Sequence, residues 1–244
     1  MKILISNDDG YGAPGVEALK STLALSNDVW YSLPDRDRSG ASQSLTLHRP
    51  IKVIRKDDTG IVVEGTPADC VRLSLSGLCP FEPDLVVSGI NSGANLGTDV
   101  LYSGTVAAAM EGVLAGVPAI AFSLTGSRFF DTAAYWSNKI VEHFAFNNLP
   151  NDYLLNVNIP DIPRSEVKGF KFTEVGRRDF SKILYKTADP RSKERYWIGL
   201  PGDPVSVSAN SDFKAISEGY VSITGISPER FARIDCAGLF EGFN

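Results

Sequence analysis

The first half of the chain alternates short apolar runs with segments whose apolar residues recur at helical spacing. Continuous apolar runs are typical of strands buried on both faces of a parallel sheet. They predict strands at Lys2–Ser6, Asp28–Ser32, Asp84–Ser88 and Ala119–Ser123. Helical spacing and stop signals predict helices at Val16–Leu25, Pro67–Ser76 and Thr105–Ala115. Strands and helices in this order predict an α/β fold with a right-handed, doubly wound, mostly parallel sheet.

The pattern changes near residue 128, after which alternating strands dominate. Shorter strands are predicted before that point at Leu45–Leu47, Ile51–Arg55 and Ile61–Glu64. Beyond it, a helix is predicted at Thr132–Asn147, half-exposed strands at Leu154–Ile159 and Phe170–Val175, and a last strand at Tyr220–Thr224. We therefore expect a catalytic core over residues 1–128 and a β-rich C-terminal extension over residues 129–244 that completes the fold.

Two strand-like arms, Ile183–Thr187 and Arg195–Ile198, flank the turn-rich segment ADPRSKE and predict a β-hairpin within Phe180–Gly199. The arms carry Leu184, Tyr185, Tyr196 and Trp197. A two-stranded hairpin is marginal alone in water, so these side chains are expected to pack on another subunit.

Composition narrows the class of protein. The chain has 244 residues and a formal net charge of −5, which argues against a nucleic-acid polymer as partner. Its three cysteines form no C-x-x-C pair, a usage that fits a reducing compartment. No signal-peptide pattern and no apolar run of about 18 residues is present, so we expect no membrane association and a cytoplasmic location.

The first candidate site is Asn7-Asp8-Asp9-Gly10, directly after the first strand. Ligands of open parallel sheets bind outside the carboxyl ends of the strands. Adjacent carboxylates there repel one another, and Mg²⁺ or Mn²⁺ would supply the counter-charge. A solvated turn is the structural alternative, because Asp-Gly is a common turn pair.

Two later loops carry polar residues at the same expected edge. Pro34–Gln43 contains Ser39 in a stretch of small residues. The alternative is that this segment is only a charged surface loop. Ser88–Thr105 is long for a compact domain and contains Asn91 and Asn95. Its end, Ser103-Gly104-Thr105, opens a helix, whose free N–H groups can bind a phosphate or be capped by the serine itself.

Four motifs in this order resemble the SurE family of 5′/3′-nucleotidases: ILISNDDG, PDRDRSG, VEGTPADCV and VSGINSGANLGTDVLYSGTVAAAMEG. The match is close over Met1–Ser123, and LLNVNIP and GYVSIT also fit.

The resemblance implies a Rossmann-like fold with one divalent cation per subunit, Mg²⁺ or Mn²⁺. The implied metal ligands are Asp8, Asp9, Ser39 and Asn91, with catalytic roles for Asp8 and Asp9. The implied phosphate-binding residues are Asn95, Ser103, Gly104 and Thr105. It also implies hydrolysis of nucleoside 5′- and 3′-monophosphates, activity on short polyphosphate, and a homodimer or homotetramer.

Two other classes share acidic residues after a first strand. A haloacid-dehalogenase-type phosphatase forms an aspartyl-phosphate but requires Asp-x-Asp, and Gly10 stands two positions after Asp8. A receiver-like phosphate-binding module needs an aspartate after its third strand, where Ser88-Gly89-Ile90-Asn91 has none.

Overall fold

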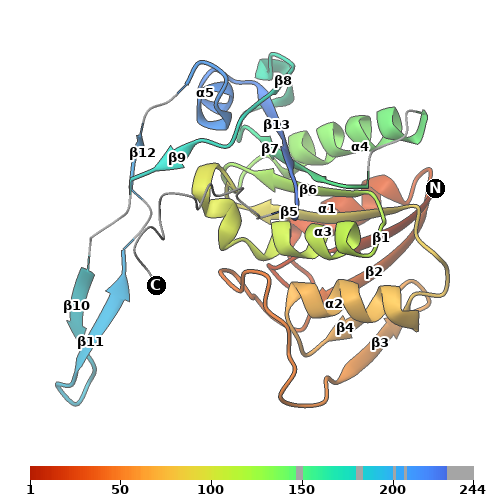
Figure 1. Cartoon of the computed structure of the whole chain (residues 1–244), viewed down its shortest axis with the longest axis horizontal. Helices are drawn as coiled ribbons and strands as arrows, with labels where there is room; N and C mark the ends of the chain where they lie inside the picture. Colours follow the sequence, from red (N-terminus) through yellow and green to blue (C-terminus); the bar gives the residue numbers. More distant parts are fainter. Residues whose placement is uncertain (147–150, 180–183, 200–201, 206–207, 230–244) are drawn as a thin grey trace, which may run out of the picture.

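The computed structural model describes residues 1–146, 151–179, 184–199, 202–205 and 208–229. A nine-stranded sheet forms its centre, in the order β3-β4-β2-β1-β5-β6-β7-β13-β8 (Figure 1). The strands are β1 Lys2–Ser6, β2 Asp28–Pro34, β3 Val53–Asp57, β4 Gly60–Val63, β5 Leu85–Ser92, β6 Ala119–Leu124, β7 Leu154–Ile159, β8 Phe170–Phe172 and β13 Val221–Ile226. Neighbours from β4 to β7 are parallel, whereas β3 and β13 are antiparallel to β4 and β7. The predicted mostly parallel α/β sheet is confirmed.

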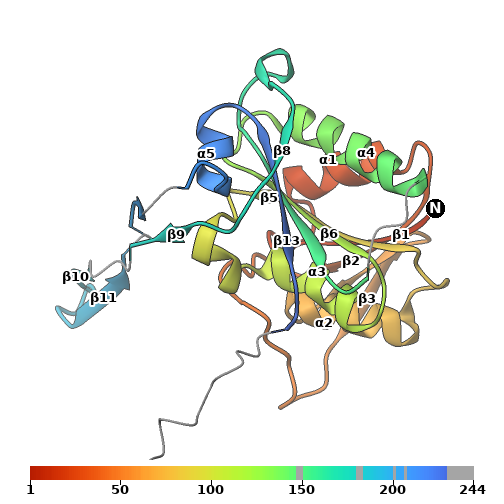
Figure 2. The same ribbon diagram turned by 45° about the horizontal axis from the view of Figure 1, so that its top comes forward.

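Helices cover both faces of this sheet (Figures 1 and 2). They are α1 Pro14–Leu23, α2 Pro67–Leu73, α3 Gly104–Leu114, α4 Phe130–Phe146 and the short α5 Asp212–Ser217. α1 and α4 pack together on one face, and α2 and α3 pack together on the other. Among the described residues, no helix is both long enough and apolar enough to cross a membrane.

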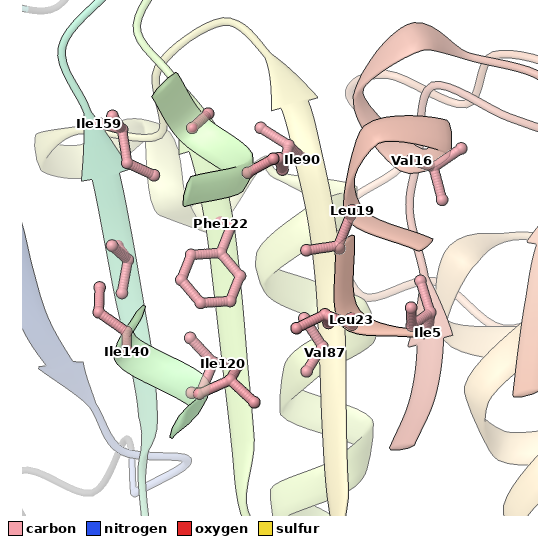
Figure 3. Close-up of a cluster of buried hydrophobic side chains, with 14 of the residues drawn as sticks. Ile5, Val16, Leu19, Leu23, Val87, Ile90, Ile120, Phe122, Ile140 and Ile159 are labelled. Carbon is pink, nitrogen blue, oxygen red and sulfur yellow. The ribbon is translucent and has the colours of Figure 1, made fainter. Parts of the chain in front are cut away.

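The core explains why the apolar runs form central strands. Successive side chains of a strand point to opposite faces, so Ile3 and Ile5 pack under α1 while Leu4 packs on the α2–α3 side. Figure 3 shows the α1–α4 side, where Phe122 of β6 lies among Ile120, Ile140 and Ile159. Strands with two buried faces need apolar residues at consecutive positions, and β1, β5 and β6 have them.

Two predicted strands differ from the structure. No strand forms at Leu45–Leu47: the Thr46 N–H donates to the Asp69 carboxylate, and Leu47 is exposed. Leu154–Ile159 was expected to be half-exposed, yet all six residues of β7 are buried. The reason is that helices pack on both faces of β7, and its asparagine side chains bond to the backbone of Asn95 rather than to water.

Helix ends also shift from their predicted positions. α1 and α4 begin two residues earlier than predicted, at Pro14 and Phe130, and α3 begins at Gly104. The α-helix expected over Pro67–Ser76 ends at Leu73 and continues as a wider turn, Ser74–Leu78. Gly77, inside that turn, has a non-helical φ of 126°.

The predicted hairpin is present. β10 (Leu184–Ala188) and β11 (Glu194–Ile198) pair antiparallel and project away from the main sheet (Figure 1). At its base, β9 (Arg177–Arg178) pairs with β12 (Pro204–Val205). The outer predicted residues 180–183 lie outside the described part of the chain.

The sheet continues across residue 128, because β7 pairs with β6 along its whole length. The division into a core of 1–128 and an extension of 129–244 stays a prediction. What the structure describes is an extension built from β7, β13 and β8 onto the same sheet.

Candidate metal and phosphate site

The three sequence-predicted loops meet at one edge of the sheet. β2, β1 and β5 are neighbours in the sheet and parallel, so their carboxyl ends lie side by side. The loop after β1 carries Asp8 and Asp9, the loop after β2 carries Ser39, and the end of β5 carries Asn91. The expected grouping of these loops is therefore what the topology produces.

Asp8 lies against the first turn of α3. Its side chain is almost fully buried, and its Oδ1 accepts a hydrogen bond from the Thr105 hydroxyl. A methyl group at Gly104 would lie 2.7 Å from the Asp8 Cβ, so any side chain there would push the helix away. The absence of a side chain at Gly104 permits the close approach. The positive end of the α3 dipole thus faces a buried carboxylate.

Asp9 is less buried and is held from the third loop. Its Oδ2 accepts a hydrogen bond from the Ser92 N–H at 3.0 Å. No described residue donates to its Oδ1. Asp9 therefore presents one unused carboxylate oxygen beside Asp8.

Burial disfavours the charged forms of both carboxyl groups. It raises the pKa of Asp8 above its ordinary value, although hydrogen bonds from Thr105 act in the opposite direction. Burial also raises the pKa of Asp9 to about 6; the Ser92 N–H opposes this shift, and the charges of Asp8 and Asp37 add to it. A nearby cation would favour the charged form of both groups.

The second loop is tied directly to the first. The Arg38 N–H donates to the Asp8 carbonyl at 2.8 Å. Asp37 accepts from the Ser39 N–H at 2.7 Å and from its hydroxyl at 2.6 Å, so the lone pairs of the Ser39 Oγ remain available. Gly10 has a φ of 91°, and a Cβ there would lie 2.6 Å from the Arg36 carbonyl carbon. Gly10 thus lets the two loops pack together.

Asn91 is the next-to-last residue of β5, and its side-chain amide is already oriented by a hydrogen bond. Its Nδ2 donates to the Gly93 carbonyl at 2.9 Å, which leaves the side-chain Oδ1 as the free acceptor. An amide oxygen, a hydroxyl oxygen and two carboxylates form the all-oxygen donor set that hard divalent cations prefer.

The buried polar atoms around the site also fit a cation. Asn7 is fully buried and donates from Nδ2 to the Gly10 carbonyl at 3.0 Å, while its Oδ1 has no partner among the described residues. The described residues contain no group of three or more His, Cys, Asp or Glu side chains suited to a metal. A metal site here therefore depends on the serine and asparagine oxygens in addition to Asp8 and Asp9.

Asn95 lies in a buried part of the third loop, and its role in phosphate binding stays a prediction. It is 6% exposed, and its side-chain Nδ2 donates to the Ser123 Oγ at 2.8 Å. Its backbone N–H donates to Asn158, and its carbonyl accepts from Asn156 and Asn158. Sequence reasoning missed Asn156 and Asn158. Their polar side chains in the otherwise apolar run LLNVNI could have indicated that they bond to another part of the chain.

Ser103 and Thr105 have different partners at the start of α3. The Ser103 Oγ accepts from the Val106 N–H at 3.1 Å, which makes Ser103 the N-cap and leaves its hydroxyl proton free to donate. The Thr105 hydroxyl donates its hydrogen bond to Asp8. The structure thus brings Gly104 and Thr105 against Asp8, with Ser103 as the residue before them.

Comparisons with known proteins show the family to which the chain belongs. A family model described as "Survival protein SurE" matches residues 3–182. The chain is 49% identical over 239 residues to "5′-nucleotidase SurE" of Nitrosococcus oceani, covering 96% of this chain and 95% of that one. It is 46% identical to the protein of the same name from Aeromonas hydrophila, over 98% of this chain and 97% of the relative.

A solved structure is similar over its full length. The crystal structure of the SurE protein from Aquifex aeolicus superposes with a TM-score of 0.87 at 38% identity, covering 100% of both chains. The resemblance drawn from the four motifs is confirmed by these matches, and the chain belongs to the SurE family.

Proposed function

We propose that the chain is a divalent-metal-dependent phosphatase that hydrolyses nucleoside 5′- and 3′-monophosphates to nucleoside and phosphate. The observation that carries the proposal is the pair Asp8 and Asp9 at a helix start, with oxygen donors on the two neighbouring loops. Relatives covering nearly the whole chain are named 5′-nucleotidases. Phosphate release from a panel of nucleoside monophosphates and short polyphosphate, in EDTA and then with Mg²⁺ or Mn²⁺, tests it.

The proposed mechanism assigns separate tasks to the residues of the site. Asp8, Asp9, Ser39 and Asn91 would hold one cation, which supplies Lewis-acid polarisation of a phosphoryl oxygen and acidifies water. The Gly104 backbone and the Ser103 hydroxyl would bind the remaining phosphoryl oxygens at the positive end of α3. The Asp9 carboxylate would also help to orient the attacking water.

Thr105 takes a different task from the one expected. Its side chain donates to Asp8, so we assign its hydroxyl to the orientation of that carboxylate. Its place in the first turn of α3 keeps it at the phosphate-binding end.

The structure disfavours the haloacid-dehalogenase alternative. That chemistry needs an aspartate two positions after Asp8, and a side chain at Gly10 would lie 2.6 Å from the backbone of Arg36. The receiver-like alternative lacks its acceptor aspartate, since β5 ends in Asn91 and Ser92.

Replacing Asp8 or Asp9 by Asn is expected to abolish metal-dependent phosphate release while the fold persists. The amide keeps the shape but removes a charge that the cation requires. Phosphate release at saturating metal and far-ultraviolet circular dichroism measure the two effects. Near-normal turnover in either variant would overturn the assignment.

In the metal-free protein, the charged form of Asp9 should destabilise the fold. The pKa of Asp9 in the folded protein, about 6, lies above the ordinary value of 3.8. Ionisation of Asp9 therefore lowers the free energy of unfolding, an effect that is absent below pH 3.8 and complete above pH 6. Because Asp9 is partly exposed, Asp9→Asn should raise stability by about 1 kcal/mol in EDTA at pH 7.5, and not at pH 3.5. Thermal melts of Asp9→Asn and of the fully exposed control Asp58→Asn measure this, and an equal gain in the control would refute it.

Substitutions of Ser103 and of Thr105 should have different effects on activity. Ser103→Ala is expected to weaken inhibition by inorganic phosphate by about 1–3 kcal/mol, the size of a lost hydrogen bond to a charge. Ser103→Thr keeps the hydroxyl and is the matched control. Thr105→Val should instead raise the metal concentration for half-maximal activity, because it frees Asp8. Unchanged phosphate inhibition in Ser103→Ala would rule out this anion site.

The hairpin is proposed to hold a homodimer or homotetramer together in the cytoplasm. Leu184, Tyr185, Tyr196 and Trp197 are all more than half exposed, an apolar surface that a partner subunit would cover. Deleting Ile183–Ile198 and closing the chain with a short Gly-Ser turn should lower the molar mass per particle measured by light scattering. Lys193→Ala at the tip is the control. A monomeric wild type, or an unchanged assembly after the deletion, would refute this interface.

A further inference from the structure

The end of the long loop is held by residues from the last third of the chain. This segment, Asn95–Leu101, lies between Asn91 and the Ser103–Thr105 helix start and contains the turn η2 (Gly97–Leu101). β9 runs beside η2, and α5 lies above it in Figures 1 and 2. None of the residues from β9 or α5 is among the proposed metal or phosphate ligands.

Asp212 is the centre of this contact. Its carboxylate is fully buried at the start of α5. Oδ2 accepts from the Gly97 N–H at 2.7 Å, and Oδ1 accepts from the N–H groups of Gly176 and Phe213 at 3.0 and 2.8 Å. A buried carboxylate with three backbone donors is costly to disturb, because losing one donor leaves a polar group unpaired. The carboxylate therefore joins η2, the segment before β9, and α5.

Phe213 closes the same junction from its apolar side. A Cβ at Gly97 would lie 2.6 Å from the Phe213 ring, and one at Gly176 would lie 2.5 Å from it. The two glycines leave room for the ring between the loop and the segment before β9. The position of Gly97 is thus fixed by one hydrogen bond and by ring packing.

A second, more exposed connection joins η2 to β9. The Arg178 Nε donates to the Asp99 Oδ2 at 2.7 Å, and the guanidinium lies 4.7 Å from the centre of the Phe213 ring. Both charged side chains are 22% exposed. An ion pair of this exposure contributes modestly by itself, but it restrains the loop two residues after Gly97.

The other end of the segment is held by β7. Asn158 accepts from the Asn95 N–H and, with Asn156, donates to the Asn95 carbonyl. The segment is therefore fixed at Asn95 from β7 and at Gly97 from α5. Between these points the chain has little freedom to move.

We propose that Asp212 is a positioning residue for phosphate release: its bond to Gly97 sets the path of Asn95–Leu101 and hence the position of the Ser103–Thr105 helix start. The inference rests on the proposed function of that helix start. Misplacing a binding group by about 1 Å can cost roughly 100-fold in rate. Asp212 achieves its effect without touching substrate or metal.

The test compares Asp212→Asn with Asp161→Asn. Asp161 is chemically matched, since its carboxylate accepts the N–H groups of Ser127, Arg128 and Phe129 before α4. In Asp212→Asn an amide N–H₂ would face one of the three backbone donors, so kcat/KM for a nucleoside monophosphate should fall by roughly 10- to 100-fold. Inhibition by inorganic phosphate should weaken in parallel, and Asp161→Asn should change neither.

The metal requirement separates positioning from general damage. The proposed metal ligands all precede Asn95, so the Mg²⁺ concentration for half-maximal activity should stay within about twofold of wild type in Asp212→Asn. The proposal is overturned if kcat/KM stays within threefold of wild type. It is also overturned if Asp161→Asn loses as much, or if metal affinity falls in step with kcat/KM.

A second pair of variants decides the matter if Asp212→Asn fails to fold. Arg178→Met keeps the packed stem, and Asp99→Asn removes the other half of the same ion pair. Each should lower kcat/KM by several-fold, and the double variant should be no worse than either single variant. Unchanged kcat/KM in both singles would overturn the proposal.

Hydrogen exchange keeps this inference distinct from the proposed function. If wild-type protein releases no phosphate from any nucleoside monophosphate, the proposed function fails. Faster amide exchange over residues 95–101 in Asp212→Asn, and not in Asp161→Asn, would still support the anchoring of the loop. Unchanged exchange there would overturn it.

Discussion

The contact between the Asp8 carboxylate and the first turn of α3 is the constraint around which the site is arranged. It requires a strand that ends at the centre of the sheet and a glycine at position 104, because a Cβ there would collide with Asp8. A helix start offers roughly half a positive charge. That is too little for two carboxylates, and burial raises the pKa of both Asp8 and Asp9. The remaining demand for positive charge is why this arrangement suits a divalent cation bound beside an anionic substrate.

Much of the fold could be predicted because the apolar runs that form β1, β5 and β6 are buried on both faces. The prediction of half-exposed residues was wrong at β7. Polar and apolar residues alternate there, but none of them faces solvent. Asn156 and Asn158 bond to the backbone of Asn95, more than sixty positions earlier in the chain. Periodicity reports only that a residue is polar. Whether water or a distant loop satisfies it depends on tertiary structure.

The same limit applies to the site. The loops carrying Asp8, Asp9, Ser39 and Asn91 could be grouped from the sequence, since each follows a parallel strand and such strands end at one edge. The hydrogen bond from Thr105 to Asp8 could not be predicted, because it depends on how closely α3 approaches β1. Asp212 gave no signal at all: an acidic residue in the first turn of a short helix is ordinary, and its bond to Gly97 spans 115 positions.

The contacts that hold the long loop differ in burial, and this difference decides which part of the loop is held more firmly. Asp212 is fully buried and bonded to three backbone groups, so its geometry is set by the fold itself. Arg178 lies on β9, at the base of the hairpin, where it also donates to the Gly202 carbonyl. Gly97 is therefore held by a fully buried carboxylate and Asp99 by a partly exposed ion pair, so the later part of the loop is restrained less firmly than its start.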